Sequence, residues 1–362
     1  MSTPVDIAVV GAGAAGIAAA IGAARAGART LLLDQRPAPG GTGGFSGLTT
    51  LCGLYDDAGQ ILNDGFTREF ADAMTERAPV RMGKVWVLPY RPENFCSVAA
   101  RLMAAESNLR TVWSTPLTRV TVERDSIVRL NEFKVGAVID CTGSAEVARA
   151  AGVECLATDE TTQAAAVLFP LHGVARKFSS PVEMASVLLP LARAGFPPLS
   201  FQPSLEPDTL TAKFTGHPEQ VEPVIQFLRA NVAGFENCGT PLTSFTAASR
   251  AGRMIIGQHL LTGADVLSGR KFPDAAARCA WPVEQWSADG VARFQYLPPG
   301  VHYEIPARSL RARQVTNLFM AGKSISADVE AIASARVMGG CLATGAAAGV
   351  LAARHLQSAS TE

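Results

Sequence analysis

Three glycines near the start of the chain are spaced for binding phosphate groups. Gly11, Gly13 and Gly16 form the pattern G-x-G-x-x-G directly after a short apolar run at residues 5–10. The first glycine permits a tight turn, the second lets the backbone approach a pyrophosphate, and the third lets a helix pack closely on a strand. This spacing predicts a site for the diphosphate of a dinucleotide.

The residues that follow complete the unit that such a site requires. A helix of small residues is expected at 14–26, and its free N–H groups and dipole attract anions. A second buried strand is expected at 29–33 and ends at Asp34, 18 residues after Gly16. A carboxylate at this position accepts hydrogen bonds from a ribose diol. A helix that merely packs through glycine and alanine would not explain Asp34.

Both FAD and NAD bind to such a cradle, and two features favour FAD. A glycine-rich loop at 35–48 suits a chain that runs beside a long ligand. A later strand at 136–140 is followed by Thr142 and Gly143, where a tight turn can close over the dinucleotide. No second G-x-G-x-x-G follows a later strand, which argues against a separate NAD(P)H domain.

Longer motifs carry a resemblance to a known family. They include "GAGAAGIAAA", "GGTGG", "DCTGSAEVARAAGV", "YEIPARSL" and "NLFMAGKSISADVEAIASARVMGGCLATGAAAG". Over nearly its whole length the chain resembles FAD-dependent oxidoreductases of the glutathione-reductase-like flavoprotein superfamily, within a bacterial branch of mostly unassigned substrate. The resemblance implies FAD as the cofactor and a Rossmann-like fold.

The resemblance also implies which residues hold FAD. Leu117 would offer its backbone to the adenine, Thr142 and Gly143 would close over the diphosphate, and the helix from about Gly340 would point its N-terminus at the flavin. Gly322 would begin the C-terminal flavin segment. The full set of expected positions is Gly11, Gly13, Ala14, Ala15, Gly16, Asp34, Gln35, Arg36, Gly41, Thr42, Gly43, Gly44, Leu117, Thr142, Gly143, Gly322, Arg336 and Gly340.

Four residues are candidates for the chemistry. In the fold that the chain resembles, the strand bearing His302, Tyr303 and Arg308 passes near the reacting face of the flavin. These side chains are expected to serve as a base, a proton donor and an anchor for an anionic group, unless they are a surface histidine and structural residues at a domain junction. Cys52 could relay electrons or form an adduct, although a buried cysteine usually behaves as a small hydrophobe.

Two further arginines are expected on one helix. A long helix at 246–260 would place Arg250 and Arg253 on the same face, where they would bind an anion or form a solvated surface. Arg336 precedes the flavin helix and would contact the flavin or the substrate. The histidines show no spacing that indicates a metal site.

Length and pattern set the expected domains. The chain has 362 residues, with 48% hydrophobic and 18% charged residues, which suits two packed domains. The predicted fold class is α/β, with a Rossmann-like FAD-binding domain that is discontinuous in sequence, at 1–50, 99–152 and 305–362. A mixed α+β substrate or cap domain is expected at 51–98 and 153–304.

Charge and cysteine content limit the partners and the compartment. Lys and Arg together number 32, as do Asp and Glu, so no basic surface for nucleic acid is indicated. Seven cysteines without a C-x-x-C pair argue against a disulfide framework and favour the cytoplasm. No membrane span is expected. A small-molecule substrate is expected, and a homodimer or a partner protein stays open.

Three functions remain open from the sequence. The first is hydride or electron transfer between flavin N5 and a small organic substrate. The second is a flavin-dependent monooxygenase, which would need NAD(P)H. The third is a maturation factor or subunit whose FAD serves a protein partner.

Overall fold

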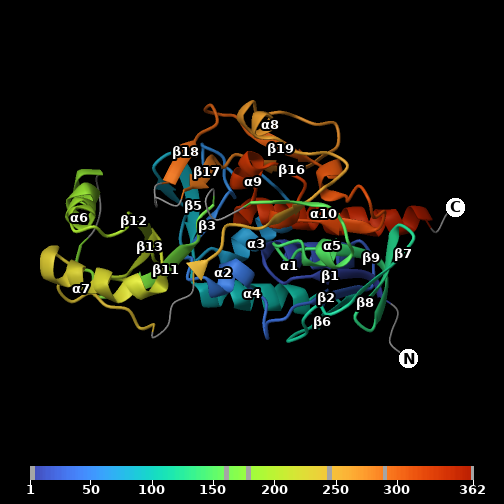
Figure 1. Ribbon diagram of the computed structural model, residues 1–362, viewed down its shortest axis with the longest axis horizontal. Helices are drawn as coiled ribbons and strands as arrows, with labels where there is room; N and C mark the ends of the chain where they lie inside the picture. Colours follow the sequence, from blue (N-terminus) through green and yellow to red (C-terminus); the bar gives the residue numbers. More distant parts are fainter. Residues whose placement is uncertain (1–4, 159–162, 177–180, 243–246, 288–291, 360–362) are drawn as a thin grey trace.

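A seven-stranded sheet forms the centre of the computed structural model, which describes residues 5–158, 163–176, 181–242, 247–287 and 292–359 (Figure 1). Its strand order is β6-β2-β1-β9-β8-β7, and β20 also pairs with β9. Strands β6, β2, β1, β9 and β20 pair in parallel, whereas β7, β8 and β9 form antiparallel pairs. The bounds are β1 Val5–Val10, β2 Thr30–Leu33, β6 Leu109–Val112, β7 Val120–Glu123, β8 Ser126–Leu130, β9 Phe133–Asp140 and β20 Leu318–Met320.

Both faces of this sheet are buried, which explains why its central strands are apolar runs. Ile7 and Val9 of β1 pack into a core with helix α1 (Ala14–Arg25) and helix α10 (Met338–Ala359). The alternate residues Ala8 and Val10 pack into a second core on the other face, beside helix α5 (Glu146–Ala150). This doubly covered parallel sheet confirms the predicted α/β fold class with a Rossmann-like core.

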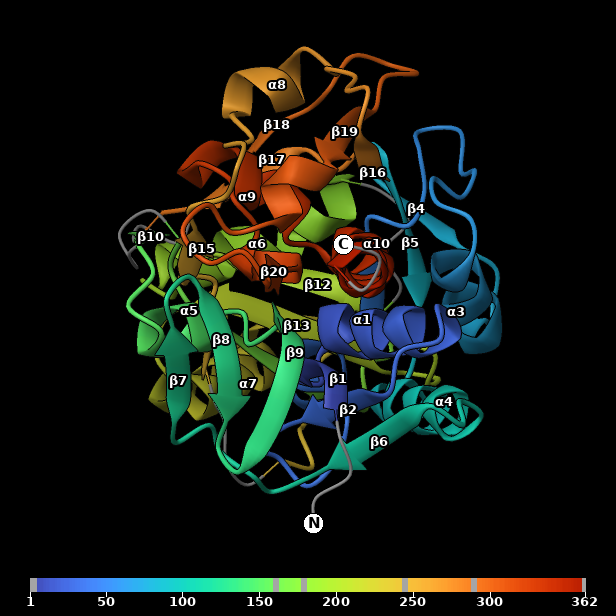
Figure 2. The ribbon, with the colours of Figure 1, turned by 90° about the vertical axis from the view of Figure 1, so that its right-hand side faces the viewer.

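Helices α1 and α10 approach each other closely because small residues line both (Figure 2). A Cβ atom at Gly345 would lie 2.1 Å from the carbonyl oxygen of Ala15, and one at Gly349 would lie 2.3 Å from that of Ala19. Within the described residues no single helix is long and apolar enough to cross a bilayer. Helices α9 (Val329–Ala335) and α10 would together have the length and apolar composition of a membrane span, but the chain bends sharply between them.

A short helix within the glycine-rich loop and the segments that follow the loop pack against the same core. They comprise α2 Gly41–Phe45, β3 Thr50–Cys52, α3 Phe66–Met74, β4 Val80–Met82, β5 Val85–Pro89 and α4 Pro92–Ala104. Phe70 and Phe95 share a hydrophobic cluster with Ile17 and Ile21 of α1. Residues 51–98 thus contribute to the core of the nucleotide-binding helices, and the domain boundaries stay a prediction.

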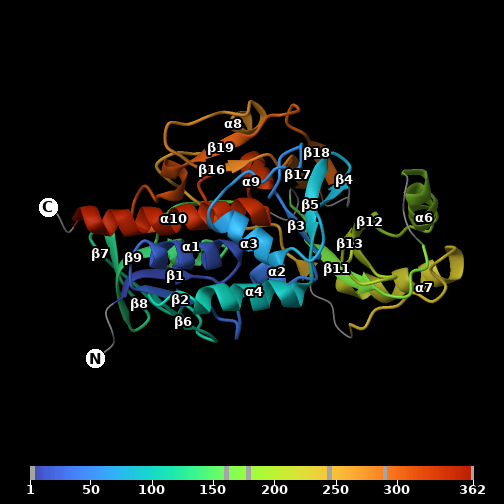
Figure 3. The same cartoon turned by 180° about the vertical axis from the view of Figure 1, so that it is seen from behind.

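A lobe built on a four-stranded sheet lies at one end of the molecule (Figures 1 and 3). Its strand order is β12-β13-β11-β14, and a separate hydrophobic cluster joins it to two helices. The bounds are β11 Ala166–Leu171, α6 Pro181–Arg193, β12 Leu199–Pro203, β13 Leu210–Thr215, the 3-10 turn η1 Pro218–Gln220, α7 Val221–Asn231 and β14 Ala247–Ala248.

The other elements are short strands, turns and one short helix, several of which pack against α9 and α10. Their bounds are β10 Cys155–Ala157, β15 Arg253–Ile255, α8 Gly263–Leu267, β16 Ala275–Cys279, β17 Val283–Trp286, β18 Ala292–Gln295, β19 Tyr303–Pro306, η2 Ala307–Leu310 and η3 Gly322–Ser324. The helix expected at 246–260 is wrong. Residues 253–255 instead form a strand that pairs with β10, and the glycines at 252 and 257 flank it in close contact with neighbouring segments.

Candidate functional site

A cavity of about 600 Å³ lies at the carboxyl ends of β1, β2, β9 and β20 and extends to the four-stranded lobe. Ligands of open α/β sheets bind at this edge of the strands. The predicted site residues that line the cavity are Gly11, Gly13, Ala14, Ala15, Asp34, Gln35, Arg36, Gly41, Thr42, Gly43, Cys52, Leu117, Thr142, Gly143, Gly322 and Arg336. Residues from five distant parts of the sequence therefore meet in one space.

The three glycines of the motif are glycine for different reasons. Gly11 has a φ of +98°, and a Cβ there would lie 2.6 Å from the carbonyl oxygen of Cys141. A Cβ at Gly16 would lie 1.7 Å from the carbonyl oxygen of Gly11. At Gly13 the nearest protein atom would be 3.9 Å away, at Gly41, so the packing of the protein does not require glycine there. The free volume beside Gly13 is a cradle that a Cβ would fill, which fits the close approach of the FAD diphosphate.

Asp34 is held in place by backbone donors at the end of β2. One carboxylate oxygen accepts a hydrogen bond from the Ala12 N–H at 2.5 Å, and the other accepts one from the Arg36 N–H at 2.8 Å. The side chain lines the cavity together with Gln35 and Leu117. A fixed carboxylate at this place suits the ribose hydroxyls of the adenosine half of FAD.

The turn after β9 is braced by a buried carboxylate. Asp140 accepts hydrogen bonds from the Thr142 hydroxyl at 2.7 Å and from the Thr142 N–H at 3.1 Å. It also accepts from the N–H groups of Val147 and Ala148 at the start of α5. Burial nevertheless raises the pKa of Asp140. These bonds fix Thr142 and Gly143 where the sequence predicts closure over the diphosphate.

Three of the expected FAD positions contact protein rather than the cavity. A Cβ at Gly44 would lie 2.4 Å from the sulfur of Cys96, and one at Gly340 would lie 2.6 Å from the carbonyl oxygen of Ala335. Gly16 packs against Gly11. These glycines allow α2, α10 and α1 to pack closely, and so they shape the cavity without lining it.

The predicted catalytic strand lies away from the cavity. Tyr303 is fully buried, and its hydroxyl forms a 2.8 Å hydrogen bond with the hydroxyl of Ser334. The backbone oxygen of His302 accepts a hydrogen bond from Lys271. Neither side chain lines the cavity, because β19 pairs with β16 and faces a separate hydrophobic cluster. Their expected roles as proton donor and base find no support in this geometry.

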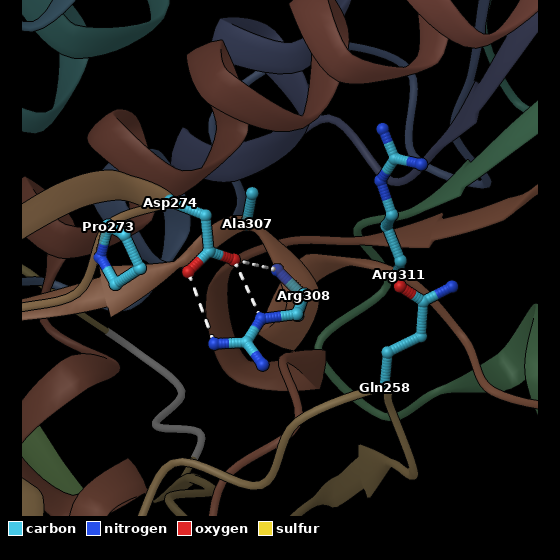
Figure 4. Close-up of a pocket in the computed structure, with 6 residues that line it drawn as sticks. All are labelled: Gln258, Pro273, Asp274, Ala307, Arg308 and Arg311. Carbon is cyan, nitrogen blue, oxygen red and sulfur yellow. Dashed lines mark hydrogen bonds and ion pairs between the residues drawn. The ribbon is translucent and has the colours of Figure 1, made fainter.

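Arg308 lies in an open pocket on the surface (Figure 4). Its guanidinium donates to both oxygens of Asp274, at 3.0 Å and 3.3 Å. Gln258 and Arg311 line the same pocket. Arg308 is already paired, and it is not placed to anchor a substrate in the larger cavity.

Cys52 does line the cavity, on strand β3. Burial raises the pKa of its thiol to about 12. Because the thiolate is the reactive form of cysteine, this environment does not favour a relay or an adduct at neutral pH. In the part of the chain that the structure describes, no three His, Cys, Asp or Glu side chains are grouped to hold a metal ion.

The cavity also contains a charged cluster, of which the sequence singled out Arg250 and Arg336 but not Lys213 or Glu284. Lys213 of β13, Glu284 of β17 and Arg250 line it together with Arg336, which ends α9. The indole N–H groups of Trp281 and Trp286 donate to the two carboxylate oxygens of Glu284, at 2.9 Å and 2.5 Å. No local motif joins all four residues, and the fold brings them together from the lobe and the main body.

Comparisons with known proteins agree with this fold. The family model described as FAD dependent oxidoreductase matches residues 6–190 and 195–361. A 71-residue segment is 42% identical to sarcosine oxidase subunit alpha of Corynebacterium sp. (strain U-96), covering 20% of this chain and 6% of that protein.

Two solved structures show the same fold. GidA of Aquifex aeolicus aligns with 98% of this chain and 64% of its own chain, at 13% identity and a TM-score of 0.56. CabE, an aromatic hydroxylase from angucycline biosynthesis, aligns with 89% of this chain and 57% of its own, at 12% identity and a TM-score of 0.50. The chain spans less than two thirds of each of these relatives.

Proposed function

Because the chain belongs to the FAD dependent oxidoreductase family, we propose that it transfers a hydride or electrons between FAD and a small organic substrate. FAD is the cofactor, and its bound flavin supplies a ring that accepts or gives a hydride at N5. One observation carries the proposal: a single cavity is lined by the glycine cradle and also by half-buried charged side chains and aromatic side chains. Placement in the glutathione-reductase-like superfamily stays a prediction.

Different residues of the chain would bind different parts of FAD and the substrate. Gly13 leaves space for the diphosphate, Asp34 is fixed for the ribose, and Asp140 holds the turn at Thr142. Trp281 is buried and lines the substrate part of the cavity. A buried aromatic side chain excludes water from its side of the cavity, which strengthens the electrostatic interactions there.

Lys213 is the side chain best placed to exchange a proton with the substrate. It lines the cavity, and its ammonium lies 4.2 Å from the centre of the Trp286 ring. Burial lowers its pKa, and the charges of Arg250 and Arg336 act in the same direction, against the attraction of Glu284. A lysine shifted in this way can exchange a proton closer to neutral pH than an exposed one.

Anaerobic reduction tests this function. The purified protein should be yellow, and its FAD absorbance should bleach with a member of a panel of alcohols, amines and acids in the absence of NAD(P)H. Bleaching by NADH or NADPH alone, with oxygen-dependent hydroxylation of an aromatic compound, would support a monooxygenase and contradict the proposal. Bleaching only after addition of a co-purified protein would instead support a subunit that serves a partner.

A further inference from the structure

Three cationic side chains surround one carboxylate in the cavity, and none of them forms an ion pair with it. Lys213, Arg250 and Arg336 all line the cavity beside Glu284. Within the described residues, no carboxylate oxygen lies within 4.0 Å of their nitrogen atoms. The carboxylate of Glu284 is occupied by the two tryptophan N–H donors instead.

Neutral groups are the partners of these cations. Arg250 donates to the carbonyl oxygen of Ala164 at 2.6 Å, and its guanidinium lies 4.3 Å from the centre of the Trp286 ring. Arg336 donates to the side-chain oxygen of Gln163 at 3.1 Å. The ammonium of Lys213 also lies over the Trp286 ring. With Lys213 protonated, the cluster carries three positive charges and one negative charge, so within the described residues two positive charges lack a counter-ion.

Burial makes this excess charge unfavourable. Burial lowers the pKa of Arg250 to about 10, and the neighbouring Arg336 adds to that effect. The pKa of Arg336 is lowered by burial as well. Buried charges are normally retained only when they are paired, so a cluster of this kind is expected to gain from a bound anion.

Among the residues that line the cavity, two buried polar atoms have no hydrogen-bond partner within the described part of the chain. The Nε of Arg336 is buried and forms no hydrogen bond, and the side-chain oxygen of Gln202 is in the same state. Gln202 is 8% exposed and lines the cavity. Buried polar groups are nearly always hydrogen-bonded, so these atoms indicate that a polar ligand completes the site.

A cation outside this cluster, Lys323, is placed to neutralise the diphosphate of FAD. A Cβ at Gly143 would lie 3.4 Å from the Cε of Lys323, which places this lysine at the turn predicted to close over the diphosphate. Its ammonium donates to the carbonyl oxygens of Ser249 and Ala251. Lys323 can therefore serve the cofactor, which leaves Lys213, Arg250 and Arg336 for the substrate.

Aromatic side chains adjoin the charged cluster. Trp281, Phe294 and Tyr296 line the cavity; Trp281 is buried, whereas Phe294 and Tyr296 are about two-fifths exposed. They offer apolar surface to the body of a ligand whose anionic group reaches the cations.

We propose that the substrate is a small organic acid whose anionic group is bound by Arg336, Arg250 and Lys213, and whose apolar body contacts the aromatic side chains. This proposal rests on the proposed function and specifies the substrate class of the same cavity.

Titration of the FAD-loaded protein with benzoate tests the proposal. Benzoate should bind by calorimetry in chloride-poor buffer and should perturb the visible flavin spectrum, whereas the neutral isostere benzamide should bind at least roughly tenfold more weakly. Phenylphosphonate distinguishes the head group: tighter binding than benzoate would assign a phosphate-like anion to the same site. Equal binding of benzamide and benzoate would overturn the proposal.

Substitutions test whether benzoate binds at the charged cluster. Arg336→Gln should weaken benzoate by roughly 10- to 100-fold, and Arg336→Lys should recover part of that loss. Lys213→Met should also weaken benzoate while leaving the melting temperature equal or higher, because it removes a desolvated cation that forms no ion pair within the described residues. Arg81→Gln, which removes an exposed cation from β4, is the matched control and should change neither value.

The outcomes separate the two proposals. Unchanged benzoate affinity in Arg336→Gln and Lys213→Met would overturn the anion site, even if FAD is bound and reduced normally. A protein that binds benzoate but is not reduced by any organic donor would leave the anion site standing and contradict the proposed function.

Discussion

The two ends of the cavity are formed by different kinds of chemical groups. The cofactor end is formed by backbone and by fixed side chains such as Asp34 and Asp140, whose oxygens are satisfied within the protein. The substrate end is formed by long charged side chains such as Lys213 and Arg336, which are incompletely paired. The cofactor end can bind a ligand without rearrangement, because its polar groups are already hydrogen-bonded. The substrate end would become more stable when an anion binds to its charged side chains.

The largest effect is expected from a substitution that disrupts the packing of α1 against the turn at Gly11. Gly16→Ala should reduce the free energy of unfolding by about 3 kcal/mol, because its Cβ would lie 1.7 Å from a backbone oxygen that cannot move aside. Urea denaturation of the FAD-free protein measures this. Unchanged stability would mean that α1 does not contact the turn as closely as described.

The next variant affects the ligand without affecting the packing. Gly13→Ala should weaken FAD by roughly 100-fold, about 2.7 kcal/mol, because its Cβ would stand in the space for the diphosphate. The stability of the FAD-free protein should change by only about 1 kcal/mol. Fluorescence titration with FAD gives the first value and urea denaturation the second. Normal FAD affinity would contradict the assignment of the cradle.

The pH dependence of FAD binding tests the charge at the cofactor end. Burial lowers the pKa of Lys323 to about 8, with Arg336 acting in the same direction. Because the diphosphate favours the protonated lysine, FAD affinity should be constant below about pH 7 and fall as the pH rises through 8, by up to roughly tenfold per unit. Lys323→Met should bind FAD more weakly at pH 7 and show a flat profile from pH 7 to 9. An identical slope in both proteins would exclude Lys323 from the site.

The smallest effect is expected outside the cavity. Arg308→Gln removes an exposed ion pair with Asp274, and exposed pairs contribute little. FAD content, benzoate affinity and turnover should all match the parent protein. A clear loss of turnover would restore Arg308 to the catalytic role that its sequence context suggested.

The same contrast explains how much could be predicted from the sequence. The cofactor end was accessible because a phosphate cradle needs glycines at fixed spacing, and Asp34 follows at a fixed distance along one β-α-β unit. The backbone turn at Thr142 could be placed for the same reason. Among these positions, only Gly16, Gly44 and Gly340 contact protein instead of lining the cavity.

The substrate end could not be predicted in this way. Lys213, Arg250, Glu284 and Arg336 come from separate segments, and a charged side chain in a strand usually faces solvent. The sequence singled out Arg250 as a possible anion-binding residue but paired it with Arg253 on one helix, whereas glycines at 252 and 257 divide this run and Arg253 lies in a strand. Strand β13 does carry one signal, since Lys213 is its only charged residue and four of its six residues are buried.

A crystal structure of the protein with FAD and benzoate tests the division of the cavity most directly. The account predicts the diphosphate beside Gly13 and the turn at Thr142, and the benzoate carboxylate within hydrogen-bonding distance of Arg336 and Arg250. Benzoate bound elsewhere, with the cluster of Lys213, Arg250, Glu284 and Arg336 unchanged, would contradict it.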